Sequence, residues 1–91
     1  MSAFENPKAR WSQRFATADY IFGLQPNAYL RAQIGLLTPG RTLAIADGEG
    51  RNGVWLAEQG HRVESFDFIE AAVTKAQKLA AERGVSLQAI C

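Results

Sequence analysis

Two short apolar segments separated by a glycine-rich turn and a short helical segment constrain this chain more than any other feature. The first, RTLAIA at residues 41–46, does not alternate with polar residues, which predicts a strand buried on both faces of a parallel sheet. The second, RVESFDF at residues 62–68, follows a segment with helical spacing at about residues 52–59. A helix that joins two parallel strands makes a right-handed crossover. The pattern therefore predicts a β-α-β unit.

The alternation of strand and helix patterns continues to the last residue. Residues 69–84 carry an apolar stripe opposite charged side chains, which predicts a helix that ends at a glycine. The segment VSLQAIC at residues 85–91 predicts a third strand. We therefore expect an α/β fold, a Rossmann-like parallel sheet with flanking helices. Because three parallel strands alone leave long unpaired edges, we interpret them as the first three strands of a larger domain.

Two helices are expected before the first strand. Pro7 suits the first position of a helix over residues 7–15, with Asn6 as its cap. A second helix is expected to follow Asn27 and to stop before TPG at residues 38–40. The aromatic segment between the two helices is predicted to be an ordered loop.

Composition excludes several classes of function. The chain has 91 residues and a formal charge of +1, so it forms at most one domain and offers no strong field for nucleic acid. Its apolar runs fall far short of the roughly 20 residues that span a bilayer, and no signal peptide is evident. One cysteine, Cys91, permits no internal disulfide, which suits a cytoplasmic protein. No spacing of potential ligands suggests a metal, and the only histidine, His61, is expected to be an exposed turn residue.

The first strand leads directly into DGEGRNG at residues 47–53. Ligands of open parallel sheets bind at the carboxyl ends of the strands, where glycines permit positive φ angles and close approach of a ligand. The letters GEGRNG match the G-x-G-x-x-G pattern of dinucleotide-binding sites. By itself this match is weak evidence for such a site, and it is stronger where the pattern lies between a predicted strand and a predicted helix, as it does here. A turn without any ligand remains the alternative.

The acidic residues near this turn distinguish between cofactors. Asp47 and Glu49 would oppose a pyrophosphate, because like charges about 4 Å apart repel by roughly 4 kcal/mol at an effective dielectric of 20. They suit a cofactor that carries a sulfonium and an ammonium instead. Asp67 lies nineteen residues after Gly48, which suits an acid that accepts both ribose hydroxyls. Alternatively, Asp67 caps the helix that begins near residue 69.

The segment LAIADGEGRNGVWLAEQGHRVESFD at residues 43–67 resembles the first motif and the second-strand acid of class I S-adenosylmethionine-dependent methyltransferases. Upstream, RWSQRFATADYIFGLQPNAYL at residues 10–30 is similar to the amino-terminal segment of the subgroup related to tellurite-resistance and thiopurine methyltransferases. The resemblance implies that residues 1–91 form the N-terminal, cofactor-binding half of one domain. Within it, residues 1–40 would form helices and a lid, and residues 41–91 the β-α-β-α-β unit.

The resemblance also implies roles for individual residues. Gly48 and Gly50 would lie under the methionine part of S-adenosylmethionine, with Arg51 close to it. Asp67 would hold the ribose, and Phe68 would lie against the adenine.

Four aromatic residues upstream are further candidates. By the same resemblance, Tyr20 and Phe22 would close over the methionine end of the cofactor, with packing in the core as the alternative. Trp11 and Phe15 are expected in the core rather than in a lid.

Two positions depart from the family pattern. The family usually has an acid where this chain has Ala44, and a glycine where it has Ala46. An acid occurs instead at Asp47, which makes this residue a candidate for the cofactor site and leaves the ammonium contact open. The methyl group of Ala46 would narrow the approach to the cofactor.

These observations favour a methyltransferase that transfers a methyl group from S-adenosylmethionine to a small-molecule acceptor. The acceptor and the catalytic residues are not indicated by the sequence. Two alternatives stay open: part of a nicotinamide- or flavin-dependent oxidoreductase, and a non-catalytic module that associates with itself through an exposed strand edge.

Overall fold

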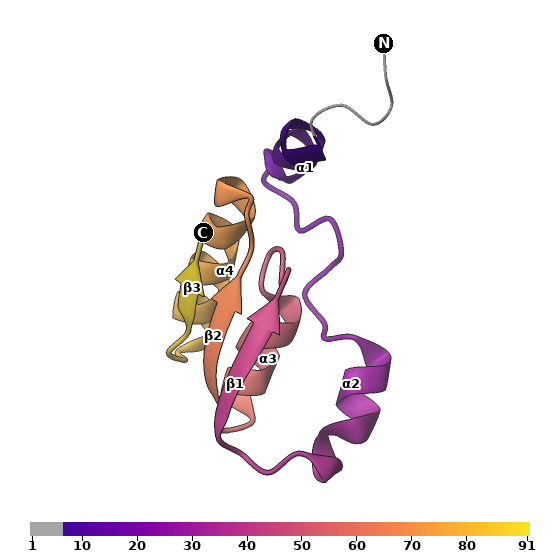
Figure 1. Cartoon of the computed structure of the whole chain (residues 1–91), viewed down its shortest axis with the longest axis vertical. Coiled ribbons are helices and arrows are strands. Elements are labelled where there is room, and N and C mark those ends of the chain that lie inside the picture. The colour runs from indigo at the N-terminus through magenta and orange to yellow at the C-terminus, as the bar shows by residue number, and fades with distance from the viewer. Residues whose placement is uncertain (1–6) are drawn as a thin grey trace.

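A computed structural model describes residues 7–91 and contains one sheet of three parallel strands (Figure 1). Strands β1 (Arg41–Ile45), β2 (Arg62–Phe66) and β3 (Gln88–Ile90) lie in the order β1-β2-β3. Arg41 is paired with Arg62 at the start of the first pair of strands, and Phe66 with Ile90 at the end of the second. The Rossmann-like α/β fold expected from the sequence is confirmed.

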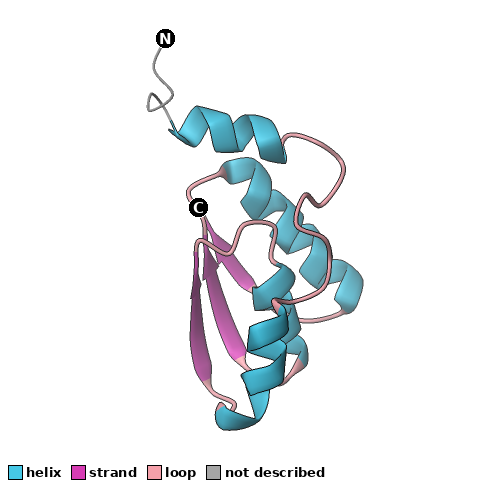
Figure 2. Cartoon of the chain, turned by 90° about the vertical axis from the view of Figure 1, so that its right-hand side faces the viewer, coloured by secondary structure: helices cyan, strands magenta, loops and turns pink. Residues whose placement is uncertain are grey.

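The two crossover helices cover the same face of the sheet (Figure 2). Helix α3 (Arg51–Glu58) joins β1 to β2, and α4 (Glu70–Arg83) joins β2 to β3. Each step moves one strand further in the same direction, so right-handed crossovers place both helices on one side. The core lies between this face and the helices, where Val54 and Leu79 are almost fully buried.

The opposite face of the sheet is bare within the described residues (Figure 2). Successive side chains of a strand point to opposite faces, and in β1 every second residue is exposed. Leu43 is 55% and Ile45 75% exposed on this face. The expectation that the first strand is buried on both faces is therefore wrong, because helices pack on only one of them.

The N-terminal elements lie beside this β-α unit (Figure 1). Helix α1 (Pro7–Phe15) packs against α4, whereas the expected cap Asn6 lies outside the described residues. Helix α2 (Ala28–Gln33) continues as a 3₁₀ turn, η1 (Ile34–Leu36). Its predicted start is confirmed, because Asn27 accepts hydrogen bonds from the N–H groups of the second and third helical residues.

His61 is buried, contrary to the expectation of an exposed turn residue. Gly60 has a φ angle of 94°, which turns the chain sharply into β2. The imidazole of His61 is then only 7% exposed, and its Nδ1 lies 2.9 Å from the Thr42 hydroxyl of the neighbouring strand. The parallel register places these two residues together, which no local pattern indicates.

Candidate functional site

A cavity of about 310 Å³ lies at the carboxyl ends of β1 and β2. Its size is at the lower end of the range that holds small molecules. It is lined by Trp11, Phe15, Phe22, Ala46, Asp47, Gly48, Arg51, Asn52, Asp67, Phe68 and Ile69. Six of the eight residues that the sequence suggested for a cofactor site are among them. The other two, Gly50 and Tyr20, do not line this cavity.

The turn between β1 and α3 has an unusual backbone. Ala46, Gly48 and Gly50 have φ angles of 54°, 62° and 89°, so the chain alternates repeatedly into the left-handed region. Gly50 packs against α4: a Cβ atom at this position would lie 2.7 Å from the Cβ atom of Ala76. Gly50 therefore allows the close approach of α3 and α4, whereas Gly48 faces the cavity.

Asp47 is held from two sides. Its Oδ2 accepts a hydrogen bond of 2.7 Å from the Ser65 hydroxyl, and its Oδ1 accepts one of 3.2 Å from the backbone N–H of Gly53. Burial raises the pKa of Asp47 above its ordinary value, although both hydrogen bonds oppose the shift. Asp47 thus links the first strand, the second strand and the first turn of α3 while it lines the cavity.

Asp67 lies between the end of β2 and the start of α4, and its carboxylate connects this segment to the glycine turn. Its Oδ2 accepts a hydrogen bond of 3.0 Å from the N–H of Gly48, and its Oδ1 accepts one of 2.9 Å from the N–H of Ile69. The second bond closes a turn just before α4, whose N-cap is Ile69 and has no side-chain cap. The alternative expectation, that Asp67 caps this helix, is therefore wrong. Because a carboxylate oxygen has two lone pairs, each oxygen retains an acceptor site for a ligand.

Three rings form one wall of the cavity, which we call the aromatic wall: Trp11, Phe15 and Phe22. Trp11 stacks on Phe15 with 5.5 Å between ring centroids, and Phe22 lies 6.3 and 6.4 Å from the two. Phe15 is also buried against Ile69, so it belongs to the core as expected. Its role in the cavity was not evident from the sequence, because only tertiary packing brings α1 to the glycine turn.

The basic residue of the cavity is Arg51, whose guanidinium lies 6.0 Å from the ring centroid of Phe22. It also donates a long hydrogen bond of 3.5 Å to the carbonyl of Gln25. Asn52, next in the chain, accepts a hydrogen bond of 2.7 Å from the N–H of Asn27. The first turn of α3 therefore contacts the segment before α2 as well as the cavity.

Glu49 does not face a ligand. Its carboxylate is buried and accepts hydrogen bonds from Lys75 Nζ at 2.7 Å and from the N–H of Ile21 at 2.8 Å. The expectation that this carboxylate would host the cation of a cofactor is therefore wrong, since Lys75 already neutralises it. Sequence reasoning missed this pair because its members lie 26 residues apart.

Tyr20 packs next to the second core cluster, against Val54 and Leu79. Its hydroxyl donates a hydrogen bond of 3.2 Å to the carbonyl of Lys75. Burial raises the pKa of the phenol, and the nearby carboxylates of Glu82 and Glu49 raise it further. In this structure Tyr20 contributes to packing, the alternative that the sequence left open.

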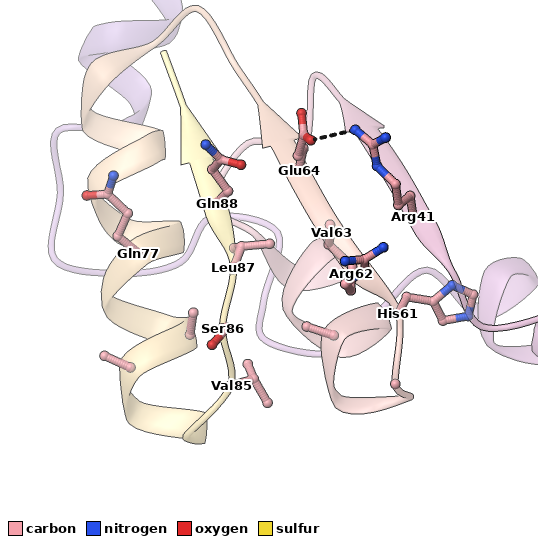
Figure 3. A pocket seen from close by; sticks show the side chains of 14 residues that line it. Arg41, His61, Arg62, Val63, Glu64, Gln77, Val85, Ser86, Leu87 and Gln88 are labelled. Atoms are coloured by element: carbon pink, nitrogen blue, oxygen red, sulfur yellow. Dashed lines mark ion pairs between the residues drawn. The ribbon is translucent and has the colours of Figure 1, made fainter.

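A second hollow lies at the opposite ends of the strands (Figure 3). It encloses about 1060 Å³ but is wide open, and its polar side chains include an ion pair of 3.5 Å between the exposed Arg41 and Glu64. Neither the glycine turn nor the strand-end acids contribute to it. The smaller cavity, with its convergent acids and glycines, is therefore the candidate site.

Other classes of site are not evident in residues 7–91. No group of three or more His, Cys, Asp or Glu side chains in this part of the chain is arranged to hold a metal ion. None of its helices is both long enough and apolar enough to cross a membrane.

Comparison with solved structures identifies the fold. TehB from Haemophilus influenzae is 18% identical, with a TM-score of 0.63 over 88% of this chain and 26% of that one. An S-adenosylmethionine-dependent methyltransferase from Geobacter sulfurreducens, in complex with S-adenosyl-L-homocysteine, is 20% identical, with a TM-score of 0.60 over 86% and 34%. A Pyrococcus abyssi tRNA (uracil-54, C5)-methyltransferase, also in complex with S-adenosyl-L-homocysteine, is 27% identical, with a TM-score of 0.59 over 65% and 15%. The chain thus spans about a third or less of the length of these proteins.

Comparison with protein families gives a more specific result. The model of the family described as tellurite resistance protein TehB matches residues 20–90, which is most of the chain. None of the curated proteins matches it. The matched segment includes the glycine turn, both strand-end acids and all three strands. The chain therefore belongs to the tellurite resistance protein TehB family, and its sheet and crossover helices are part of the class I methyltransferase fold.

Proposed function

We propose that this chain binds S-adenosylmethionine in the cavity at the glycine turn and supplies the cofactor-binding part of a methyltransferase that acts on a small molecule. The observation that carries the proposal is the position of Asp67. Its carboxylate lies at the carboxyl end of β2, lines the cavity and is fixed by two backbone N–H groups. A fixed carboxylate with a free lone pair on each oxygen suits the two neighbouring hydroxyls of a ribose.

The apolar surfaces of the cavity support the same ligand. Phe68 follows Asp67 directly, lines the cavity and is 53% exposed, so its ring is available to a purine beside the ribose. The aromatic wall lies on the cavity as well. Burial of flat apolar surface against such rings is a large favourable contribution to binding.

The charges of the cavity favour a sulfonium cofactor over a diphosphate. Asp47 and Asp67 are its acidic side chains and Arg51 its basic one. S-adenosylmethionine carries a sulfonium, an ammonium and a carboxylate, which this set complements. A diphosphate would place like charges near two carboxylates, and each such pair at about 4 Å costs roughly 4 kcal/mol at an effective dielectric of 20. The two carboxylates of the cavity therefore disfavour the nicotinamide and flavin alternative.

The sulfonium supplies the chemistry when the cofactor is bound: its methyl group passes to a nucleophilic atom of the acceptor, and the S–CH₃ electron pair stays on sulfur. The residues of this chain would orient the cofactor and exclude water from it. Arg51 would hold the carboxylate of the methionine part and Asp47 its ammonium. Gly48 would let the backbone approach the cofactor closely.

Isothermal titration of the 91-residue chain with S-adenosylhomocysteine and with NAD tests the proposal. We expect S-adenosylhomocysteine to bind and NAD to bind more weakly. The variant Asp67→Asn should weaken S-adenosylhomocysteine binding about 10- to 100-fold, since charge-assisted hydrogen bonds contribute roughly 1.5–3 kcal/mol. Glu64→Gln, in the middle of the same strand and outside the cavity, is the matched control and should bind as the wild type does. Tighter binding of NAD, or equal binding by Asp67→Asn, would contradict the proposal.

The bare face of the sheet supports a second function, association with another copy of the chain through β1. In the described part of the chain this strand is at an edge of the sheet and exposes Leu43 and Ile45. Unpaired edges with apolar side chains promote strand pairing between molecules. Light scattering should then show a dimer that Ile45→Lys converts to a monomer. A wild-type monomer at all concentrations would exclude this function.

A further inference from the structure

The segment that carries Phe22 is fastened to the glycine turn by a small set of hydrogen bonds. We call residues 19–27, between α1 and α2, the strap. Lys75 Nζ donates a hydrogen bond of 2.6 Å to the carbonyl of Asp19, and the N–H of Ile21 donates one of 2.8 Å to Glu49 Oε1. These two contacts lie on either side of Tyr20, and the second is made by the residue directly before Phe22. The strap is therefore attached where it reaches the cavity.

The buried ion pair between Glu49 and Lys75 is the centre of this attachment. The two groups are 2.7 Å apart, with side chains that are 3% and 12% exposed. The Glu49 carboxylate also accepts the bond from the Ile21 N–H, and the Lys75 ammonium also donates the bond to the Asp19 carbonyl. Both of these partners belong to the strap backbone. A buried pair is stable only when its remaining hydrogen-bonding capacity is satisfied, and here the strap contributes to that satisfaction.

The same pair is built into the turn that lines the cavity. Glu49 lies between Gly48, which faces the cavity, and Gly50, which packs against Ala76 of α4. Lys75 precedes Ala76 on that helix. One ion pair thus joins the glycine turn, α4 and the strap.

The strap has other attachments: the part-buried Tyr20 hydroxyl donates to the carbonyl of Lys75, on the residue that forms the ion pair, and two further hydrogen bonds lie beyond Phe22. Arg51 reaches the carbonyl of Gln25 at 3.5 Å, and Asn52 accepts from the N–H of Asn27. These two bonds are exposed to solvent, and exposed polar contacts contribute little free energy to holding a segment in place. The ion pair is therefore the charged attachment of the strap next to Phe22, and it adds to the Tyr20 hydrogen bond and to the ring contacts of Phe22 with Trp11 and Phe15.

We propose that Glu49 and Lys75 are positioning residues that hold the strap, and with it Phe22 of the aromatic wall, against the glycine turn, and that they thereby set the affinity for the cofactor. The second half of this inference rests on the proposed function. Neither side chain lines the cavity, so the pair acts through the strap. If loss of the pair leaves the strap seated in a tenth of the molecules, the apparent Kd rises about tenfold.

Amide hydrogen exchange of Ile21 and titration with S-adenosylhomocysteine together test the inference. The double variant Glu49→Met with Lys75→Met leaves no unpaired buried charge, so it avoids the folding defect expected of either single variant. We expect the Ile21 amide to exchange at least about tenfold faster, relative to the amides of β2, and the Kd to rise about tenfold. Glu49→Gln combined with Lys75→Met also leaves no unpaired charge but keeps an acceptor for the Ile21 N–H, so it should restore most of both values. Lys78→Met, at an exposed position of α4, is the control and should change neither.

The two proposals fail in different ways. Unchanged Ile21 exchange in the double variant would overturn the anchoring role of the pair. Faster Ile21 exchange with a Kd within twofold of the wild-type value would overturn its effect on affinity. A wild-type chain that binds no S-adenosylhomocysteine would refute the proposed function, and the effect on affinity with it. In that case the Ile21 exchange alone would still decide whether the pair anchors the strap.

Discussion

Replacing Ala46 with glycine is expected to stabilise the chain. Ala46 has a φ angle of 54°, and no other described residue besides glycine has a positive φ. For an L-residue this conformation costs about 1–2 kcal/mol, which glycine does not incur. Glycine in turn adds roughly 0.4–1 kcal/mol of conformational entropy to the unfolded chain. Ala46 is exposed, so its methyl group contributes little burial. We expect the free energy of unfolding to rise by about 0.5–1 kcal/mol.

Thermal and urea unfolding of Ala46→Gly measure this gain. For a domain of this size, it corresponds to a rise in Tm of about 2–8 °C. Ala81→Gly is the matched control, because Ala81 is exposed in α4 with helical geometry. The same substitution there should destabilise the chain by roughly 0.5–1 kcal/mol. If Ala46→Gly destabilises the chain as much as Ala81→Gly does, the left-handed conformation of Ala46 costs less than about 1–2 kcal/mol, which would refute the expected gain.

Three further predictions concern Gly50, Asp47 and the buried His61. Gly50→Ala should destabilise the chain by about 2–5 kcal/mol in urea unfolding, because it combines a left-handed φ of 89° with a Cβ atom 2.7 Å from that of Ala76; a loss below about 1 kcal/mol would show that α4 moves aside. Burial raises the pKa of Asp47, so the folded chain binds this proton more tightly than the unfolded chain does, and stability should fall as the pH rises from the ordinary value of 3.8 through the raised pKa. Asp47→Asn should flatten that part of the pH profile, and an unchanged slope would assign it to another group. His61→Ala should lower the free energy of unfolding by about 1–3 kcal/mol through the unpaired Thr42 hydroxyl and the lost packing, which an unchanged urea midpoint would contradict.

The sequence predicted those features that depend on neighbouring residues. The apolar runs, the helical stripe and the cap at Asn27 are local signals, and the strands and helices formed where these signals placed them. The glycine turn is a local signal as well, since glycine adopts positive φ angles readily and Gly48 and Gly50 lie within three residues of each other. Its position at the end of the first strand, together with Asp67 at the end of the second, brought most of the suggested residues to one cavity.

Burial and long-range pairing were decided only by the tertiary structure. Ile45 is exposed and His61 is buried because helices cover one face of the sheet and the parallel register places His61 beside Thr42. Glu49 was expected to meet a ligand and instead pairs with Lys75. A side chain's partner depends on which elements pack together in space, and the periodicity of a sequence gives the face of an element but not what lies against that face.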